Sequence, residues 1–270
     1  MACVGKVLAL GYFDSVHLGH KLLIDRATHV LTFDDDFFSV RNLPYKQVFT
    51  LEERRIIIKK PLIVANSRQM MPMKPQEFIA YLKDIGVSRV IVGEDFHFGA
   101  NATGGISDLI SAGFSVEVVP FLQKDRQKVA SSLIKDLLTA GRIIEANRLM
   151  THDYFILGTV LHGRGDGSKL TFPTANIAIP PAKLAPKAGV YRSFTQIDGK
   201  KYLSITSLGP QPTFGSDAFR AETHVLDYHD DLYGKEIRVY LYEYLREIRK
   251  FEDKTALMKQ IEEDISRVKR

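Results

Sequence analysis

The chain has 270 residues, of which 45% are hydrophobic and 26% are charged, and its formal net charge is +5 at pH 7. This composition is ordinary for a soluble globular protein with room for two modest hydrophobic cores. The single cysteine, Cys3, excludes an internal disulfide framework, and no apolar run is long enough to span a bilayer. The Lys and Arg residues are scattered, and small phosphorylated ligands explain the excess of positive charge no less well than nucleic acid does.

The first ten residues superficially resemble the apolar core of a signal peptide. They run directly into residues 11–14, Gly-Tyr-Phe-Asp, without a small-residue cleavage site. We therefore interpret residues 6–10 as a buried strand, and we expect a cytoplasmic protein with no membrane partner.

Strand-like and helical patterns alternate from residue 6 to about residue 120. The helical stretches include residues 50–58 and 74–82, and the latter has Pro75 in its first turn, where a missing N–H does no harm. Such alternation predicts an α/β, Rossmann-like domain with a parallel sheet covered on both faces. The predicted strands are residues 6–10, 30–33, 62–65, 88–92 and 115–119.

The segment between His20 and Val30 leaves little room for a full crossover helix and a turn. Two parallel neighbours need such a crossover. Either the first helix is short, or the second strand is displaced from the first.

The pattern changes after Thr151, where strand-like segments follow one another with turns rich in Gly, Pro and Asp. This arrangement predicts an antiparallel barrel or sandwich. From Lys254 onward, Leu257, Ile261 and Ile265 recur at helical spacing and predict a closing helix. We place the boundary between residues 148 and 153, which gives domains 1–150 and 151–270. The predicted strands are residues 154–161, 189–195, 201–207, 221–228 and 237–244.

A first candidate site follows the first predicted strand, where Asp14, His17, Gly19 and His20 open a helix. Free backbone N–H groups and the positive end of the helix dipole attract phosphate there, and Gly19 lets phosphate oxygens approach the backbone. The pattern favours a phosphate site over a metal site, because no third ligand lies at a suitable spacing. Exposed loop histidines are the alternative.

A second candidate site combines Thr174 and Asn176, which follow Pro173, with Glu222 about fifty residues later. Hydroxyl and amide oxygens are good ligands for Mg²⁺ and its bound phosphates, and a lone carboxylate can take a proton from an alcohol. The alternatives are turn residues and an outward-facing strand carboxylate. The glycines of residues 163–167 offer N–H groups to phosphate or form a tight turn, and the Arg-Gly-Asp tripeptide among them is interpreted as coincidence.

The string G-Y-F-D-x-V-H-x-G-H over residues 11–20 resembles the H-x-G-H nucleotidyltransferase superfamily. With residues 92–99 and 129–135, it resembles the adenylyltransferase domain of the prokaryotic bifunctional riboflavin kinase/FAD synthetase family. This resemblance implies that AMP is transferred from ATP to FMN, with release of pyrophosphate. It implies ATP binding by Gly11, Phe13, Asp14, His17, His20, Ser131, Ser132 and Lys135, with the two histidines as catalytic residues, and FMN binding by Asp95 and Asn101.

The C-terminal half resembles the riboflavin kinase domain of the same family through a set of motifs in family order, at residues 158–163, 173–176, 188–191, 208–214, 222–227, 231–234 and 246–251. The resemblance implies a small antiparallel β-barrel that makes FMN from riboflavin and ATP. It also implies that Glu222 activates the riboflavin 5′-hydroxyl. Thr174 and Asn176 would bind Mg²⁺ and ATP together with Gly163 and Lys169, and Arg246 and Thr213 would lie near the flavin.

Three departures from the family pattern bear on the adenylyltransferase. Residues 130–135 read A-S-S-L-I-K where the family has S-S-T-x-I-R, and Lys135 supplies a charge without the fork of Arg. The acidic residues 34–36 replace Pro and His, and the segment between His20 and Val30 is short. One alternative is therefore a kinase with a weakened or regulatory N-terminal domain, and another is a non-catalytic flavin- or RNA-binding protein. We expect ATP and flavins as partners, no nucleic acid, and a monomer or weak homo-oligomer.

Overall fold

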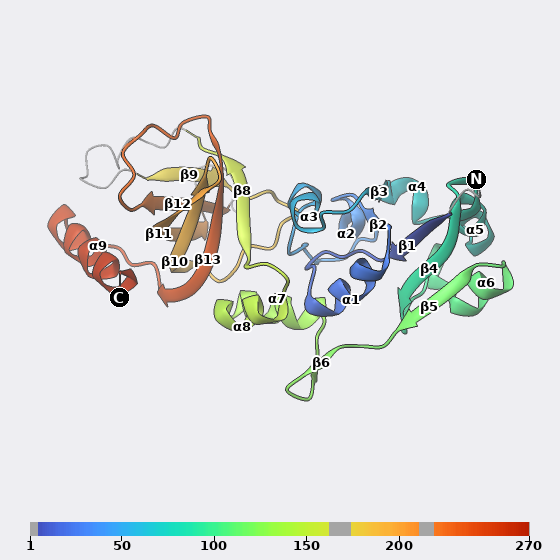
Figure 1. Ribbon diagram of the computed structural model, residues 1–270. Helices are drawn as coiled ribbons and strands as arrows, with labels where there is room; N and C mark the ends of the chain where they lie inside the picture. Colours follow the sequence, from blue (N-terminus) through green and yellow to red (C-terminus); the bar gives the residue numbers. More distant parts are fainter. Residues whose placement is uncertain (1–4, 162–173, 211–218, 270) are drawn as a thin grey trace. The chain divides into compact units, whose positions relative to one another are not determined.

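The computed structural model describes residues 5–161, 174–210 and 219–269 (Figure 1). The chain divides into two compact units. The first comprises Met1–Leu133 and Leu149–Thr151, and the second comprises Ile134–Arg148 and His152–Arg270. The described residues contain no helix that is both long and apolar enough to cross a membrane.

The first unit is built on a five-stranded sheet with the order β3-β2-β1-β4-β5, in which every neighbouring pair is parallel. The predicted parallel sheet is thus confirmed. Its strands are β1 (Lys6–Leu10), β2 (His29–Phe33), β3 (Leu62–Ala65), β4 (Val87–Gly93) and β5 (Ser115–Val119).

Helices and short segments connect these strands. Pro75 occupies the first turn of α5, as predicted from its missing N–H. The connecting elements are α1 (Leu18–Arg26), α2 (Phe37–Val40), α3 (Leu51–Ile57), α4 (Ser67–Met70), α5 (Pro75–Asp84), η1 (Ala100–Ala102), α6 (Ile106–Ser111) and the small hairpin of β6 (Gln123–Lys124) and β7 (Gln127–Lys128).

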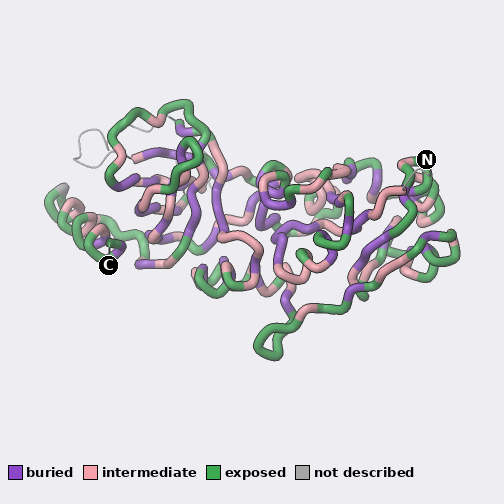
Figure 2. The backbone as a smooth tube through the Cα atoms, in the orientation of Figure 1, coloured by how far each residue is buried: buried purple, intermediate pink, exposed green. Residues whose placement is uncertain are grey.

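The core of this unit joins the sheet to α5 and α6. Phe78 and Leu82 lie one turn apart on α5, so they present one apolar stripe, and Leu109 is the buried residue of α6. They share one cluster with strand residues such as Leu8 and Val90. Most of the buried strand residues lie in the three inner strands, β1, β2 and β4 (Figure 2).

The first crossover helix is short, and the second strand is not displaced. α1 has nine residues, and β2 lies directly beside β1, with Leu8 opposite His29. Lys60 helps this helix to end abruptly, because its ammonium group donates to the carbonyls of Ile24 and Ala27 at 2.6 and 2.5 Å.

The second unit contains a six-stranded antiparallel sheet with the order β8-β13-β10-β11-β12-β9. A bridge between Leu161 and Asn176 joins its two edges, so the sheet forms a nearly closed barrel. The predicted barrel is thus confirmed, although β9 was not predicted as a strand. The strands are β8 (Phe155–Thr159), β9 (Ala175–Ala178), β10 (Gly189–Ile197), β11 (Lys200–Pro210), β12 (Phe219–Val225) and β13 (Glu236–Arg246).

Three helices accompany the barrel: α7 (Ser131–Thr139), which begins in the first unit, α8 (Ile143–Leu149) and α9 (Lys254–Val268). α9 is the predicted closing helix. The Asp253 side chain caps it by accepting the Ala256 N–H at 2.8 Å. Val268 is buried against barrel residues including Val190 and Ile205.

The barrel interior holds a chain of buried hydroxyl groups on β10, β11 and β12. The oxygen–oxygen distances between neighbouring hydroxyls are 2.8–2.9 Å, and every member is fully buried. Each hydroxyl therefore has a partner, as buried polar groups require. The members are Thr195, Ser204, Ser193, Thr206 and Thr223.

Candidate active sites

The loop from Gly11 to His17 connects β1 to α1 and carries most of the first predicted site. Two of its non-glycine residues, Phe13 and Val16, have left-handed backbones with φ of 55° and 39°. Contacts from elsewhere hold this strained loop in place. The Phe49 N–H donates to the Asp14 carbonyl at 2.8 Å, and the Thr151 hydroxyl donates to the Val16 carbonyl at 2.8 Å.

The two histidines of the H-x-G-H string lie ring on ring, with centroids 3.5 Å apart and planes 13° apart. His17 is the N-cap of α1, and its Nδ1 accepts the backbone N–H of His20 at 3.0 Å. Because Nδ1 of His17 is an acceptor, the proton of the neutral ring resides on Nε2. The edge of the His20 ring meets the Phe13 ring, with centroids 5.1 Å apart.

Both imidazoles are neutral at pH 7. Desolvation lowers the pKa of His17 to about 4, although the nearby Asp14 carboxylate opposes this shift. Desolvation also lowers the pKa of His20 well below its ordinary value, and the neighbouring His17 adds to the effect. The pair can therefore donate N–H groups to an anion.

A cavity of about 1120 Å³ opens beside these rings, entirely within the first unit. This volume exceeds the usual range of about 300–1,000 Å³ for a site that holds one small ligand. It is lined by most of the predicted residues, namely Gly11, Phe13, His17, His20, Asp95, Asn101 and Ser131.

The remaining predicted residues of this site lie outside the cavity lining. Asp14 is buried in the loop, and Ser132 and Lys135 follow Ser131 along α7. Lys135 belongs to the second unit. The Ser131 hydroxyl lies 2.8 Å from the hydroxyl of Ser15, which ties the start of α7 to the loop.

Other aromatic residues of the cavity lining, and the hairpin beside them, were not among the predicted site residues. Tyr12 stacks on Phe37, with ring centroids 4.2 Å apart. On the hairpin, the Lys128 ammonium group lies 3.0 Å from the Phe121 ring centroid and 3.5 Å from the Asp95 carboxylate. Tyr12 was detectable, because it lies inside the motif string. Lys128 belongs to an exposed strand pair that no motif marks.

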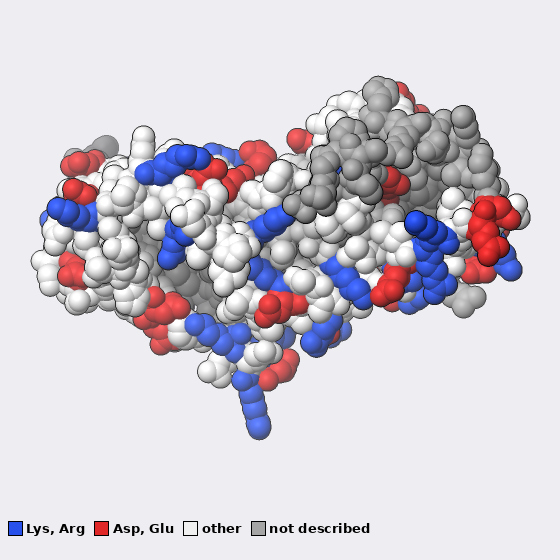
Figure 3. Space-filling model, turned by 180° about the vertical axis from the view of Figure 1, so that it is seen from behind, with Lys and Arg blue, Asp and Glu red and all other residues white. Residues whose placement is uncertain are grey.

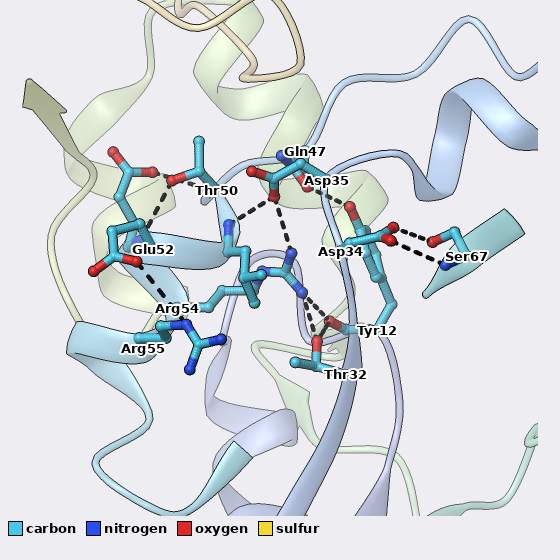
Figure 4. A network of polar contacts seen from close by, with 12 residues as sticks. Tyr12, Thr32, Asp34, Asp35, Gln47, Thr50, Glu52, Arg54, Arg55 and Ser67 are labelled. Atoms are coloured by element: carbon cyan, nitrogen blue, oxygen red, sulfur yellow. Dashed lines mark hydrogen bonds and ion pairs between the residues drawn. The ribbon is translucent and has the colours of Figure 1, made fainter. Parts of the chain in front are cut away.

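The acidic residues 34–36 are engaged in contacts of their own, and those of Asp34 and Asp35 are drawn in Figure 4. Asp34 accepts the Ser67 N–H at 3.0 Å and the Ser67 hydroxyl at the start of α4. Asp35 accepts the Leu51 N–H at 2.7 Å at the start of α3. The Asp36 carboxylate pairs with Arg68 at 3.1 Å. Two of these carboxylates thus satisfy helix N-termini, where negative charge is favourable.

In the barrel, Glu222 of β12 is the direct cross-strand partner of Asn176 on β9. Directly opposed residues share one face of a sheet, with Cβ atoms about 4.5–5.5 Å apart. The neighbours Ala221 and Thr223 are buried, so Glu222 lies on the outer face of the barrel wall. Asn176 is only 8% exposed, and Thr174 immediately precedes β9. The structure therefore brings the predicted amide and carboxylate together.

Arg246 ends β13 and contacts α9. Its Nε and Nη2 atoms bind the Asp264 carboxylate at 3.0 and 2.6 Å, and its Nη1 donates to the Glu247 carbonyl at 3.1 Å. This bidentate pair fixes the helix to the strand end. Gly163, Lys169 and Thr213, the other predicted ligands of this site, lie outside the described residues.

The donors at the barrel site are oxygen atoms from a hydroxyl, an amide and a carboxylate, which suit Mg²⁺ bound to a nucleotide. Within the described ranges, His, Cys, Asp and Glu form no group of three that could hold a metal ion.

Two family models match separate parts of the chain. Residues 2–133 match the family model for FAD synthetase, and residues 150–270 match the model for riboflavin kinase. A bifunctional riboflavin kinase/FMN adenylyltransferase of Listeria monocytogenes is 34% identical, covering 97% of this chain and 90% of the relative. The protein of the same description from Bacillus subtilis is 30% identical, covering 96% and 90%.

A solved structure from Streptococcus pneumoniae, described as a macrolide-efflux protein, superposes with a TM-score of 0.86. It is 26% identical and covers 100% of this chain and 96% of its own. That solved structure shares the fold of the whole chain. This chain therefore belongs to the family of bifunctional riboflavin kinase/FMN adenylyltransferases.

Proposed function

We propose that this chain makes flavin cofactors in two ATP-dependent reactions. Residues 151–270 phosphorylate riboflavin to FMN, and residues 1–150 transfer AMP from ATP to FMN, which yields FAD and pyrophosphate. The observation that carries the proposal is the cross-strand pair of Asn176 and Glu222. It sets the residue that we assign to Mg²⁺ and ATP beside the residue that we assign as the general base.

In the kinase reaction, Glu222 takes the proton of the riboflavin 5′-hydroxyl as that oxygen attacks the γ-phosphorus of ATP, and ADP leaves. Thr174 and Asn176 bind Mg²⁺ and the nucleotide phosphates, and we assign Gly163 and Lys169 to the same nucleotide. Mg²⁺ neutralises negative charge on the phosphates when it is bound. Arg246 and Thr213 are assigned to the flavin, Arg246 by way of its fixed position at the end of β13.

In the adenylyl transfer, a phosphate oxygen of FMN attacks the α-phosphorus of ATP and pyrophosphate leaves, without a covalent enzyme intermediate. The neutral rings of His17 and His20 donate to the phosphate oxygens, where charge develops in the transition state. Backbone N–H groups at the start of α1 contribute to the same site. We assign Gly11, Phe13, Asp14, Ser131, Ser132 and Lys135 to ATP, and Asp95 and Asn101 to FMN.

The test is a single incubation of the full chain with riboflavin, ATP and Mg²⁺, with FMN and FAD resolved by chromatography. We expect both products, and we expect a chelator such as EDTA to stop both. FMN without FAD would favour a regulatory N-terminal domain, and the absence of both would favour a non-catalytic binding protein.

We further propose a cytoplasmic monomer or weak homo-oligomer with ATP and flavins as its partners. The scattered charge supports small anionic ligands over nucleic acid, since Lys and Arg are interspersed with Asp and Glu on the face drawn in Figure 3. Analytical ultracentrifugation of the protein alone tests the oligomeric state, and a stable homo-oligomer would contradict it. The same measurement with a labelled RNA tests the choice of partners, and a stable RNA complex at physiological salt would contradict that choice.

A further inference from the structure

Arg54 on α3 is a fully buried cation in the first unit, with a side chain that is 0% exposed. A buried charge is costly unless it is paired and hydrogen-bonded. Its Nη2 donates to the Asp35 carboxylate at 3.3 Å, and its Nη1 donates to the Thr32 hydroxyl and to the Tyr12 carbonyl at 3.1 Å. The guanidinium also lies 4.8 Å from the Tyr12 ring centroid. Figure 4 shows it between these three residues.

Tyr12 is thereby held at several points. Its carbonyl accepts from Arg54 and also from the Thr32 hydroxyl at 2.6 Å. Its hydroxyl donates to the buried Gln47 side chain, and burial raises its pKa, so the hydroxyl keeps its proton. The Tyr12 ring stacks on Phe37 in the cavity lining.

The contacts on Tyr12 matter because the strained part of the loop from Gly11 to His17 begins at the next residue. Phe13 has a φ of 55°, and such a conformation persists only where its surroundings determine it. Phe49 and Thr151 hold the loop at Asp14 and Val16. Arg54 and Thr32 hold the end that leaves β1, so the direction in which the chain enters the loop depends on them.

We propose that Arg54 is a positioning residue of the adenylyltransferase site, which acts through Tyr12 to fix the loop that presents His17 and His20 to ATP. Arg54 is fully buried and does not line the cavity, so it acts without touching a substrate. This inference rests on the proposed adenylyl transfer.

If Arg54 served only to stabilise the fold, its replacement would lower the stability of the first unit, and we do not expect this. Apolar replacement of a buried ion pair is often neutral or stabilising, provided that the remaining charge is not stranded. Asp35 is 41% exposed and still accepts the Leu51 N–H, so it keeps water and a partner when Arg54 is replaced. Arg54→Met should therefore fold normally and yet position the loop poorly.

The experiment measures FMN adenylylation and riboflavin phosphorylation by the full-length wild type, Arg54→Met and Arg54→Lys. For Arg54→Met we expect a fall in the kcat of adenylylation of about 10–100-fold, since small misplacements cost up to about 10². The KM for ATP should stay within about threefold, and the kinase rate should not change. Arg54→Lys should give an intermediate kcat, because an ammonium group keeps the positive charge but lacks the planar donor fork of the guanidinium group.

Arg55→Met is the matched control, since Arg55 is the next residue, is 47% exposed and meets Glu52 only at 3.9 Å. It should match the wild type in both reactions. An unchanged kcat in Arg54→Met, or a raised KM with normal kcat, would overturn the proposal.

If Arg54→Met fails to fold, the kcat of adenylylation in Arg54→Lys becomes the test. A wild-type kcat in Arg54→Lys would then overturn the proposal. Absence of FAD formation by the wild type would instead reject the proposed function, so the two failures are distinguishable.

Discussion

The two candidate sites are built in different ways. The adenylyltransferase site gathers residues that are close in sequence, on a strained loop after a parallel strand, and distant residues hold that loop in shape. The kinase site gathers Asn176 and Glu222 from distant segments, on the ordinary extended backbone of β9 and β12. A loop site depends on contacts behind it, whereas a strand site inherits its geometry from the sheet register.

The largest expected effect belongs to the strand site. Glu222→Gln keeps the size and the strand position of the side chain but removes the base, so FMN formation should fall by about 10²–10⁴-fold. Conversion of added FMN to FAD by the same preparation is the internal control and should be unchanged. A variant that still phosphorylates riboflavin at the normal rate would rule out Glu222 as the base.

The loop site should respond to loss of its donors. His17→Ala combined with His20→Ala removes two N–H donors and should lower FAD synthesis by at least about 10²-fold, while FMN formation persists. His17→Asn is a matched variant that can still cap α1 through its side-chain oxygen, so it separates the donor role from the helix cap. Unchanged FAD synthesis in the double variant would discredit the loop as the adenylyl-transfer site.

Acid should weaken the first unit through the same histidines. The folded-state pKa of His17 is about 4, below its unfolded value near 6.5, so the unfolded chain binds the proton first as pH falls. The stability present above pH 6.5 should be lost as pH drops toward 4, with roughly 2 kcal/mol gone at pH 5. Urea unfolding at pH 7 and pH 5 measures this, and His17→Asn should show a smaller pH dependence.

The smallest effect tests the acidic segment. Asp36 meets Arg68 in a pair whose side chains are 50% and 72% exposed, and such pairs contribute little. Asp36→Ala should therefore leave both rates within about twofold and stability within about 1 kcal/mol. A marked drop in the KM for ATP would show that the acidic segment repels the nucleotide, and would revive the weakened-domain alternative.

Much of the fold was predictable because local periodicity specifies local structure. The five parallel strands, Pro75 at the start of α5 and the closing helix α9 all follow from spacing within single segments. β9 was missed because it has only four residues and two of them are alanine, which is depleted in strands. Its strand conformation depends on pairing with β12.

The sequence by itself determined most of the element types and the candidate site residues, since the functional groups of His17, His20, Asn176 and Glu222 are set by residue type alone. The tertiary structure decided which of them meet and what surrounds them. The register of β9 and β12 sets Asn176 against Glu222, and the partners of Arg54 come from residues 19 to 42 positions away. Such contacts depend on which surfaces pack together, and no local pattern encodes that.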